Sequence, residues 1–226
     1  MPTELHPIDV DTLTRRFTGN MRRCQALLEA VENIRTDPRI SSVVDDMVRS
    51  VVVLLHATLE DLLRTVLSIH YRRAPESLNL QSRNVAVSAA KIWLDLLEKN
   101  REFRDDPENE EMRSMSIDEY IESVIARTLS RKSYTDTDQI GGFLTETGLE
   151  IPDREKRAYL ADISSLMARR HRIVHNADLD PAEALLPNSI DQQDVDRWLT
   201  SILEFGNTLL GKLSSAEFYR ELRESQ

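Results

Sequence analysis

The sequence predicts an all-α protein. It has 6 glycines and 8 prolines in 226 residues, and long stretches contain neither, so few positions break a helix. Leu, Ala, Glu and Arg, which favour helices, are abundant. Apolar residues recur at the three- and four-residue spacing of a helix face. We therefore expect long antiparallel helices. The chain is long enough for one well-buried domain or a tight pair of small ones, and we predict one domain over residues 1–226.

Prolines set the ends of the first two expected helices. The first covers about 10–34 and ends before Asp37-Pro38, because the residue before a proline resists the helical conformation. The second covers about 41–71 and is ended by Arg73-Ala74-Pro75. A third helix is expected over about 85–98.

Charged residues and glycines set the bounds in the second half of the chain. The acidic segment over about 101–114 is expected to be a loop. Ser116 is expected to open the next helix, because acidic residues follow it in the first turn. Gly141-Gly142 interrupts a further helical piece, which ends near Gly148. The remaining helices are expected over about 117–129, 154–176 and from 189 toward 223.

Charge and cysteine content limit the class of protein. The net charge of -10 argues against a protein that coats nucleic acid through bulk charge, but leaves a local basic site open. We expect no signal peptide, because no basic start is followed by an apolar run. The longest strongly apolar run, Val51–Leu55, is too short to span a bilayer. Cys24 is the only cysteine and is expected to be a small core residue. These features predict a cytoplasmic protein with no membrane partner.

The second expected helix is apolar on two sides. One stripe runs from Ile40 to Val66, and further apolar residues lie opposite it. A helix of this kind is central in its fold or part of a subunit interface. The opposite side also holds His56, Glu60 and Arg64, spaced four residues apart. The structural interpretation is an intrahelical charge ladder. The functional interpretation is that Glu60 helps to build a polar site.

The expected helix over 154–176 carries an arginine on its apolar side. Arg170 falls near the middle of the apolar arc, where a guanidinium is costly unless it is paired. Arg169 and Arg172 point away from the arc and are expected to be ordinary surface residues. The arc consists of Tyr159, Leu160, Ile163, Leu166, Met167, Ile173 and Val174.

The segment Arg170–His175 places an arginine and a histidine five residues apart, and His171 lies one turn before His175. Arginine can hold a phosphate with its planar fork, and histidine can move a proton near neutral pH. The segment resembles the Arg-polar-x3-His signature of the HEPN superfamily (higher eukaryotes and prokaryotes nucleotide-binding domains). Leu59–Arg64 is similar to the early helix of many HEPN proteins, where an acidic residue sits close to the Arg/His pair.

This resemblance implies a compact helical bundle and, for many members, a metal-independent endoribonuclease of toxin–antitoxin, abortive-infection or antiviral systems. It implies that His175 transfers a proton and that Arg170 binds the scissile phosphate. His171, Glu60 and Asn176 would support them. Attack by the 2′-hydroxyl of RNA would leave a 2′,3′-cyclic phosphate, so RNA is the expected partner and no metal or cofactor is required.

The resemblance also implies protein partners. Members of the superfamily commonly pair two such helices in a homodimer, and the two-sided second helix is compatible with that arrangement. An unrestrained ribonuclease would harm its host, so we expect an antitoxin or another regulatory protein.

Three other interpretations stay open. A non-catalytic HEPN-like module would bind a nucleotide or a protein and dimerise. In a purely structural interpretation, His175 stabilises the C-terminal end of its helix and Arg170 forms an ion pair with Glu60. A zinc site would use His171, His175 and Asp178, although no glutamate follows His171 as in His-Glu-x-x-His.

Overall fold

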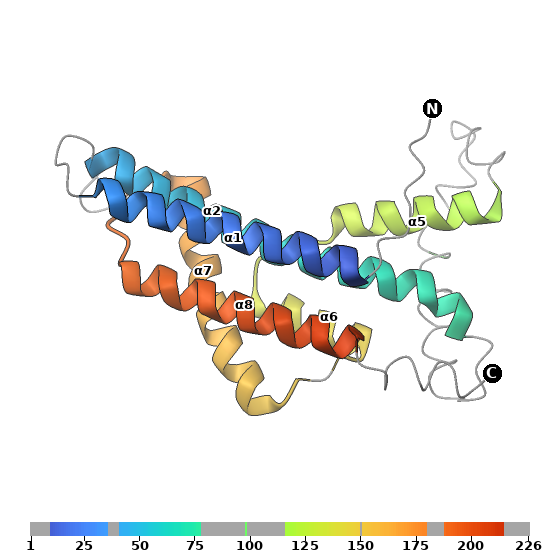
Figure 1. The fold of residues 1–226 in the computed structure, drawn as a ribbon. Coiled ribbons are helices and arrows are strands. Elements are labelled where there is room, and N and C mark those ends of the chain that lie inside the picture. Colours follow the sequence, from blue (N-terminus) through green and yellow to red (C-terminus); the bar gives the residue numbers. More distant parts are fainter. Residues whose placement is uncertain are drawn as a thin grey trace. The chain divides into compact units, whose positions relative to one another are not determined.

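The computed structural model describes residues 10–35, 41–77, 98, 116–149, 151–179 and 188–214. Within these ranges it contains helices and no strand, so the all-α prediction is confirmed. Apart from Glu98, the expected helix over about 85–98 and the acidic loop over 101–114 lie outside these ranges. The helices, labelled as in Figure 1, are α1 (Val10–Ile34), α2 (Ser41–Ser77), α5 (Ile117–Arg131), α6 (Thr137–Thr147), α7 (Asp153–Asn176) and α8 (Gln192–Ser214).

The chain divides into two compact units. The larger unit comprises residues 10–63 and 134–213, and the smaller unit comprises residues 1–9, 64–133 and 214–226. α2 contributes residues to both units. The expectation of one domain over residues 1–226 stays a prediction.

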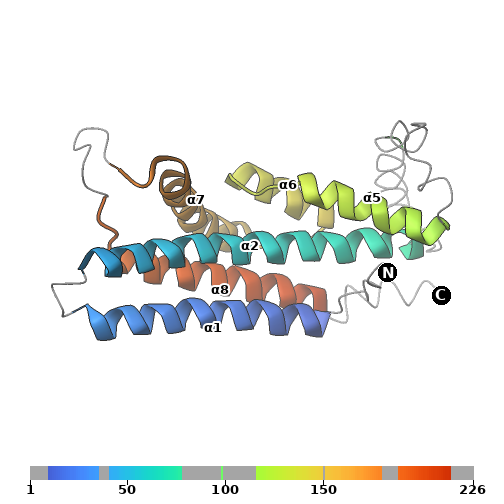
Figure 2. The same ribbon diagram turned by 90° about the horizontal axis from the view of Figure 1, so that it is seen from above.

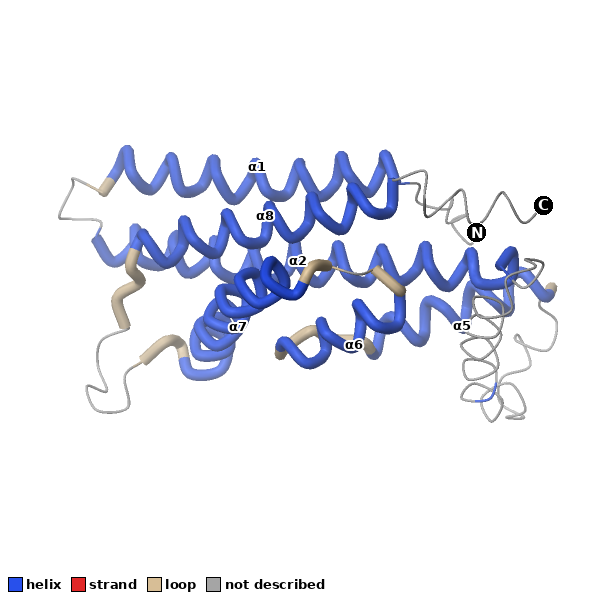
Figure 3. Tube along the Cα trace, turned by 90° about the horizontal axis from the view of Figure 1, so that it is seen from below, coloured by secondary structure: helices blue, strands red, loops and turns tan. Residues whose placement is uncertain are grey.

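In the larger unit, α1, the first part of α2 and α8 run lengthwise beside one another, and α7 crosses them (Figures 1 and 2). Arg35, just past the end of α1, donates a 3.2 Å hydrogen bond to Gln192 at the start of α8. These two helices are therefore antiparallel. Arg16 of α1 forms an ion pair with Asp61 of α2. The loops on either side of α7 are drawn in tan in Figure 3.

One face of α1 is buried along the length of the helix. Burial raises the pKa of the Cys24 thiol on this face to about 11, so the reactive thiolate is scarce at neutral pH. Cys24 is thus confirmed as a core residue. The buried residues follow the spacing of a helix face and are Leu13, Phe17, Met21, Cys24, Leu28 and Val31.

α2 is buried on both of its apolar sides, as a central helix is. Val51 and Leu55 are buried on one side, and Leu63 is buried on the other, so this prediction is confirmed. The helix does not end at Arg73-Ala74-Pro75 as expected but continues to Ser77. A proline removes one backbone donor and crowds the carbonyl four residues before it, and here the helix ends two residues after Pro75.

Local signals predict the ends of α5 and α6 well. Ser116 caps α5 through a capping box, in which Ser116 Oγ accepts from the Glu119 N–H and the Glu119 carboxylate accepts from the Ser116 N–H. These hydrogen bonds lower the pKa of Glu119. α6 ends at Gly148, whose φ of 67° lies in the left-handed region.

α6 runs without a break through Gly141-Gly142, so the expected interruption is wrong. A glycine inside a helix costs about 1 kcal/mol relative to alanine, which packing can offset. Ile140, Phe143 and Leu144 of α6 are buried around the two glycines. Burial of this apolar face therefore outweighs the weak local propensity.

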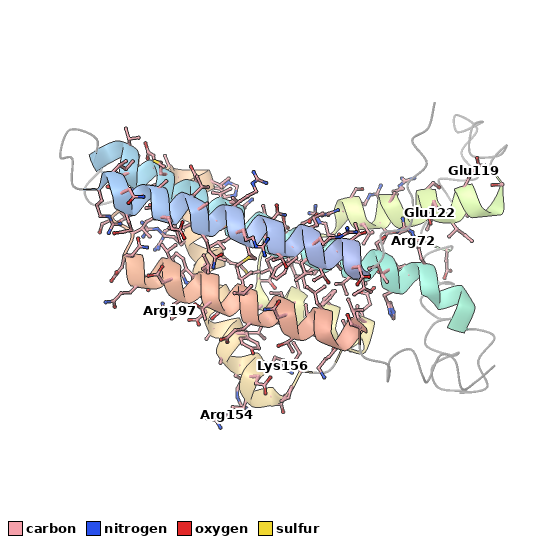
Figure 4. The ribbon with its side chains drawn as sticks, in the orientation of Figure 1. Arg72, Glu119, Glu122, Arg154, Lys156 and Arg197 are labelled. Atoms are coloured by element: carbon pink, nitrogen blue, oxygen red, sulfur yellow. The ribbon has the colours of Figure 1, made fainter. Side chains whose placement is uncertain are left out.

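In the smaller unit, the end of α2 packs with α5 through a two-pronged ion pair. Arg72 donates from Nε and Nη2 to the two carboxylate oxygens of Glu122, at 2.8 and 2.7 Å (Figure 4). Arg64 donates a 2.9 Å hydrogen bond to the backbone oxygen of Lys132, just past α5. In both units, no helix among the described residues is long and apolar enough to cross a lipid bilayer.

α1 and α8 approach closely where Gly206 faces Phe17. A Cβ atom added at Gly206 would lie 2.6 Å from Phe17 Cε1 and 2.9 Å from Cε2. Both residues are buried, so the ring has little room to move. The missing side chain of Gly206 thus lets the two helices touch.

Replacing Gly206 is therefore expected to separate α1 from α8. Gly206→Ala should lower the free energy of unfolding by about 1–3 kcal/mol, because overpacking outweighs the gain in helix propensity. The measurement is urea unfolding followed by circular dichroism. Gly211→Ala in the same helix is the control, since nothing lies within 4 Å of a Cβ there, and it should be stabilising. Equal stability of the two variants would contradict this account.

Candidate functional site

The candidate site lies at the C-terminal end of α7 in the larger unit. His171 and His175 are one turn apart, with ring centroids 4.4 Å apart and rings tilted by 44°. Both side chains are exposed, as is Asn176 at the last helical position. The structure thus brings the two predicted histidines together at the surface.

Arg170 directly precedes this histidine pair and is half-buried. Its Nε atom is shielded from solvent and has no hydrogen-bond partner among the described residues. Leaving a buried donor unsatisfied is costly, so a ligand that accepts a hydrogen bond there would remove that cost. A guanidinium in this state is suited to hold an oxyanion such as phosphate.

Glu60 and His56 of α2 hold the backbone of Tyr134. The Glu60 carboxylate accepts a 3.1 Å hydrogen bond from the Tyr134 N–H. His56 Nε2 lies 2.9 Å from the Tyr134 carbonyl oxygen, so this nitrogen carries the proton and donates it. Glu60 therefore helps to place the segment that leads into α6. Its support of Arg170 stays a prediction.

Arg169 is buried, so the expectation that it is an ordinary surface residue is wrong. Its Nη2 atom donates to the Asp178 carboxylate at 2.7 Å and to the backbone oxygens of Asn188 and Ser189 at 2.8 and 2.9 Å. Burial lowers the pKa of Arg169 from its ordinary value, and the charge of Asp178 opposes that shift. A helical wheel places Arg169 off the apolar arc. It cannot show Asp178, which lies beyond the helix and supplies the counter-charge.

Arg49 and Asp178 complete a buried charge cluster that the sequence analysis missed. Arg49 Nε donates to Asp178 Oδ2 at 3.0 Å, and its Nη2 donates to the backbone oxygen of Asn188 at 2.7 Å. The Asp178 side chain is 0% exposed. The signal that could have found the cluster is Arg49 itself, a charged residue set in the apolar stripe of α2 between Val48 and Val51.

The zinc interpretation finds no support in this arrangement. The Asp178 carboxylate is buried and accepts from two arginines through Oδ2. Within the part of the chain that the structure describes, no three His, Cys, Asp or Glu side chains are placed to hold a metal ion.

α7 ends in two consecutive left-handed residues. Ala177 has a φ of 50° and Asp178 a φ of 57°. Aspartate tolerates this region better than alanine, whose Cβ crowds the backbone there. The Asp178 N–H donates a 3.1 Å hydrogen bond to the Arg172 carbonyl oxygen and closes the helix end. The chain therefore turns back directly after His175, and Ala177 carries backbone strain.

The predicted apolar arc of α7 is buried in the middle of the helix, as expected, but it is exposed at the C-terminal end, where the prediction is wrong. Ile163, Leu166 and Met167 are buried, but Val174 is 48% exposed and Leu179, just past the helix, is 38% exposed. The last turn of α7 thus leaves the core, and apolar surface lies next to His175.

A comparison with sequence models of protein families shows which family the chain belongs to. The sequence model of the RiboL-PSP-HEPN family matches residues 21–215. The chain belongs to this HEPN family. The match spans most of α1 and all of the later helices, so the resemblance carried by Arg170–His175 is confirmed for the chain as a whole. No curated protein and no solved structure matches this HEPN chain significantly.

Relieving the strain at Ala177 is expected to stabilise this HEPN protein. Ala177→Gly should raise the free energy of unfolding by about 0.5–1 kcal/mol, because glycine adopts a positive φ without a steric penalty. Chemical denaturation of the two proteins measures the difference. Ala161→Gly, at an exposed position inside α7, is the control and should change the stability in the opposite direction. Destabilisation by both substitutions would rule out strain at Ala177.

Proposed function

We propose that this HEPN protein is a metal-independent endoribonuclease of a toxin or antiviral-defence type. The observation that carries the proposal is the exposed pair of His171 and His175, directly after Arg170 with its unpartnered Nε. These are the groups that would hold a phosphate and move a proton without a metal. Membership of the HEPN family supports the same activity.

In the proposed reaction, the ribose 2′-oxygen attacks the adjacent phosphorus while the bond from phosphorus to the 5′-oxygen breaks. The 2′-hydroxyl loses one proton and the leaving 5′-oxygen gains one. His175 makes one of these two transfers and solvent water makes the other. Arg170 binds the phosphate and stabilises the charge that develops on it. The products are a 2′,3′-cyclic phosphate and a 5′-hydroxyl. DNA lacks the 2′-hydroxyl and is not a substrate.

The remaining predicted residues have supporting roles in this proposal. His171 touches the His175 ring and limits its orientation. Asn176 is exposed beside His175, where it can contact the RNA. Glu60 acts through the backbone that it holds at Tyr134.

The surroundings of Arg170 favour this role over a structural one. The buried ion pair near this helix end is made by Arg169 with Asp178, so the fold has its structural arginine in the neighbouring position. This arrangement supports a ligand-binding role for Arg170. The exposed Val174 and Leu179 further support a protein partner next to the site, which we propose is a second copy of the chain. We also propose an antitoxin or regulatory protein that restrains the activity.

The test is cleavage of a labelled RNA in EDTA by the wild type and by folded His175→Ala and Arg170→Ala variants. We expect each substitution to lower kcat/KM roughly 100-fold or more, since proton transfer and phosphate binding contribute effects of that size. The wild type should leave cyclic phosphate ends on RNA and leave DNA of the same sequence intact.

Arg154→Ala is the matched control for these variants. Arg154 is exposed in the first turn of α7, at the other end of the helix from His175 (Figure 4). Its removal should leave cleavage unchanged. Equal cleavage by His175→Ala and the wild type would exclude His175 as the catalytic group. A wild type that binds nucleotide or protein but cuts no RNA would favour the non-catalytic HEPN module.

A further inference from the structure

We propose that Asp178 is a positioning residue for His175, an inference that rests on the proposed ribonuclease function. Asp178 lies three residues after His175 and outside α7. Its carboxylate is held by Arg49 of α2 and Arg169 of α7. Through these contacts it fixes where the last turn of α7, with His175, sits in the larger unit.

The contacts of Asp178 join three parts of the chain. Oδ2 accepts from Arg49 at 3.0 Å and from Arg169 at 2.7 Å. The Asp178 backbone oxygen accepts from the backbone N–H of Asn188 at 2.8 Å and from its Nδ2 at 2.9 Å. Both arginines also donate to the Asn188 backbone oxygen. Asp178 therefore ties the end of α7 to α2 and to the segment before α8.

Hydrophobic packing does not hold this end of α7. Residues 171–177 are all exposed except Ile173, which is half-buried. Directly after them, the Asp178 side chain is fully buried. The change from an exposed helical turn to a fully buried carboxylate occurs within one residue. The ion contacts of Asp178 are thus the principal described link between this turn and the core.

The backbone between His175 and Asp178 is short and constrained. The Asp178 N–H donates to the Arg172 oxygen, and the Leu179 N–H donates to the Asn176 oxygen, both at 3.1 Å. A displacement of the Asp178 carboxylate is therefore passed to the last turn of the helix. Catalytic groups must be placed to within a fraction of an ångström, so a small displacement of His175 would slow the reaction.

The test compares Asp178→Asn and Arg49→Lys with the wild type in EDTA, measuring kcat and KM for one RNA well below the melting temperature. Asp178→Asn keeps the shape but removes the charge, and Arg49→Lys keeps the charge but loses the planar fork. We expect kcat to fall roughly 10- to 100-fold with KM nearly unchanged, because His175 is misplaced while Arg170 still binds phosphate. If Asp178→Asn does not fold, Arg49→Lys carries the test.

Two controls separate positioning from stability. Asp162→Asn removes a carboxylate on the same helix that accepts from Arg197 at 2.8 Å and from Ser201 at 2.5 Å, far from His175 in the chain. Gly206→Ala lowers stability through the contact of α1 with α8. Both controls should keep the wild-type kcat at a temperature where they are folded. An unchanged kcat in folded Asp178→Asn and Arg49→Lys, or an equal loss in the controls, would overturn the proposal.

A second measurement does not depend on activity. Hydrogen exchange of the backbone amides at 175–179 should become at least about tenfold faster in Asp178→Asn and Arg49→Lys, and not in Asp162→Asn. A wild type that cuts no RNA would defeat the proposed function, and the exchange rates would then decide alone whether Asp178 anchors the turn. Unchanged exchange in the two variants would show that it does not.

Discussion

The end of α7 depends on one buried carboxylate between two arginines. Asp178 accepts from Arg49 and Arg169, and the positive charge that remains is met by backbone oxygens of Asn188 and Ser189. A buried ion pair adds little net stability, because desolvation offsets most of the attraction, but removing one partner typically costs about 3–5 kcal/mol. The cluster therefore determines positions more than it adds stability. It permits one arrangement of α2, α7 and the segment before α8, and penalises others.

This cluster also distinguishes two adjacent arginines of α7 by their surroundings. Consecutive helix residues point about 100° apart, so Arg169 and Arg170 face different surroundings although they are neighbours in the chain. Arg169 donates from Nη2 to Asp178 and to backbone oxygens, while its own Nε is shielded and has no partner among the described residues. Arg170 keeps a shielded Nε without a partner among the described residues. The structural requirement for a buried cation is met by Arg169, and the ligand-binding role of Arg170 is our proposal.

The features predictable from the sequence are those with local causes. The bounds of α1, the Ser116 cap and the Gly148 stop follow from residues within a few positions. The roles of His171 and His175 were hypothesised from their spacing, and their contact follows from helix geometry. Arg49 and Asp178 are 129 residues apart, and no local pattern connects them. Gly141-Gly142 does not interrupt α6, because burial of the apolar face of that helix overrides a weak local preference, and Pro75 lies in the last turn of α2.

The strain at Ala177 and the anchoring of Asp178 arise from the same turn at the end of α7. The Asp178 carboxylate is buried beside Arg169 of the helix, and the chain reaches that position through two left-handed residues. That conformation is unfavourable for alanine, so it persists because the contacts of Asp178 outweigh its cost. The same turn ends the helix directly after Asn176 and leaves His175 in its last, exposed turn. The exposure of His175 and the burial of Asp178 thus have a common cause.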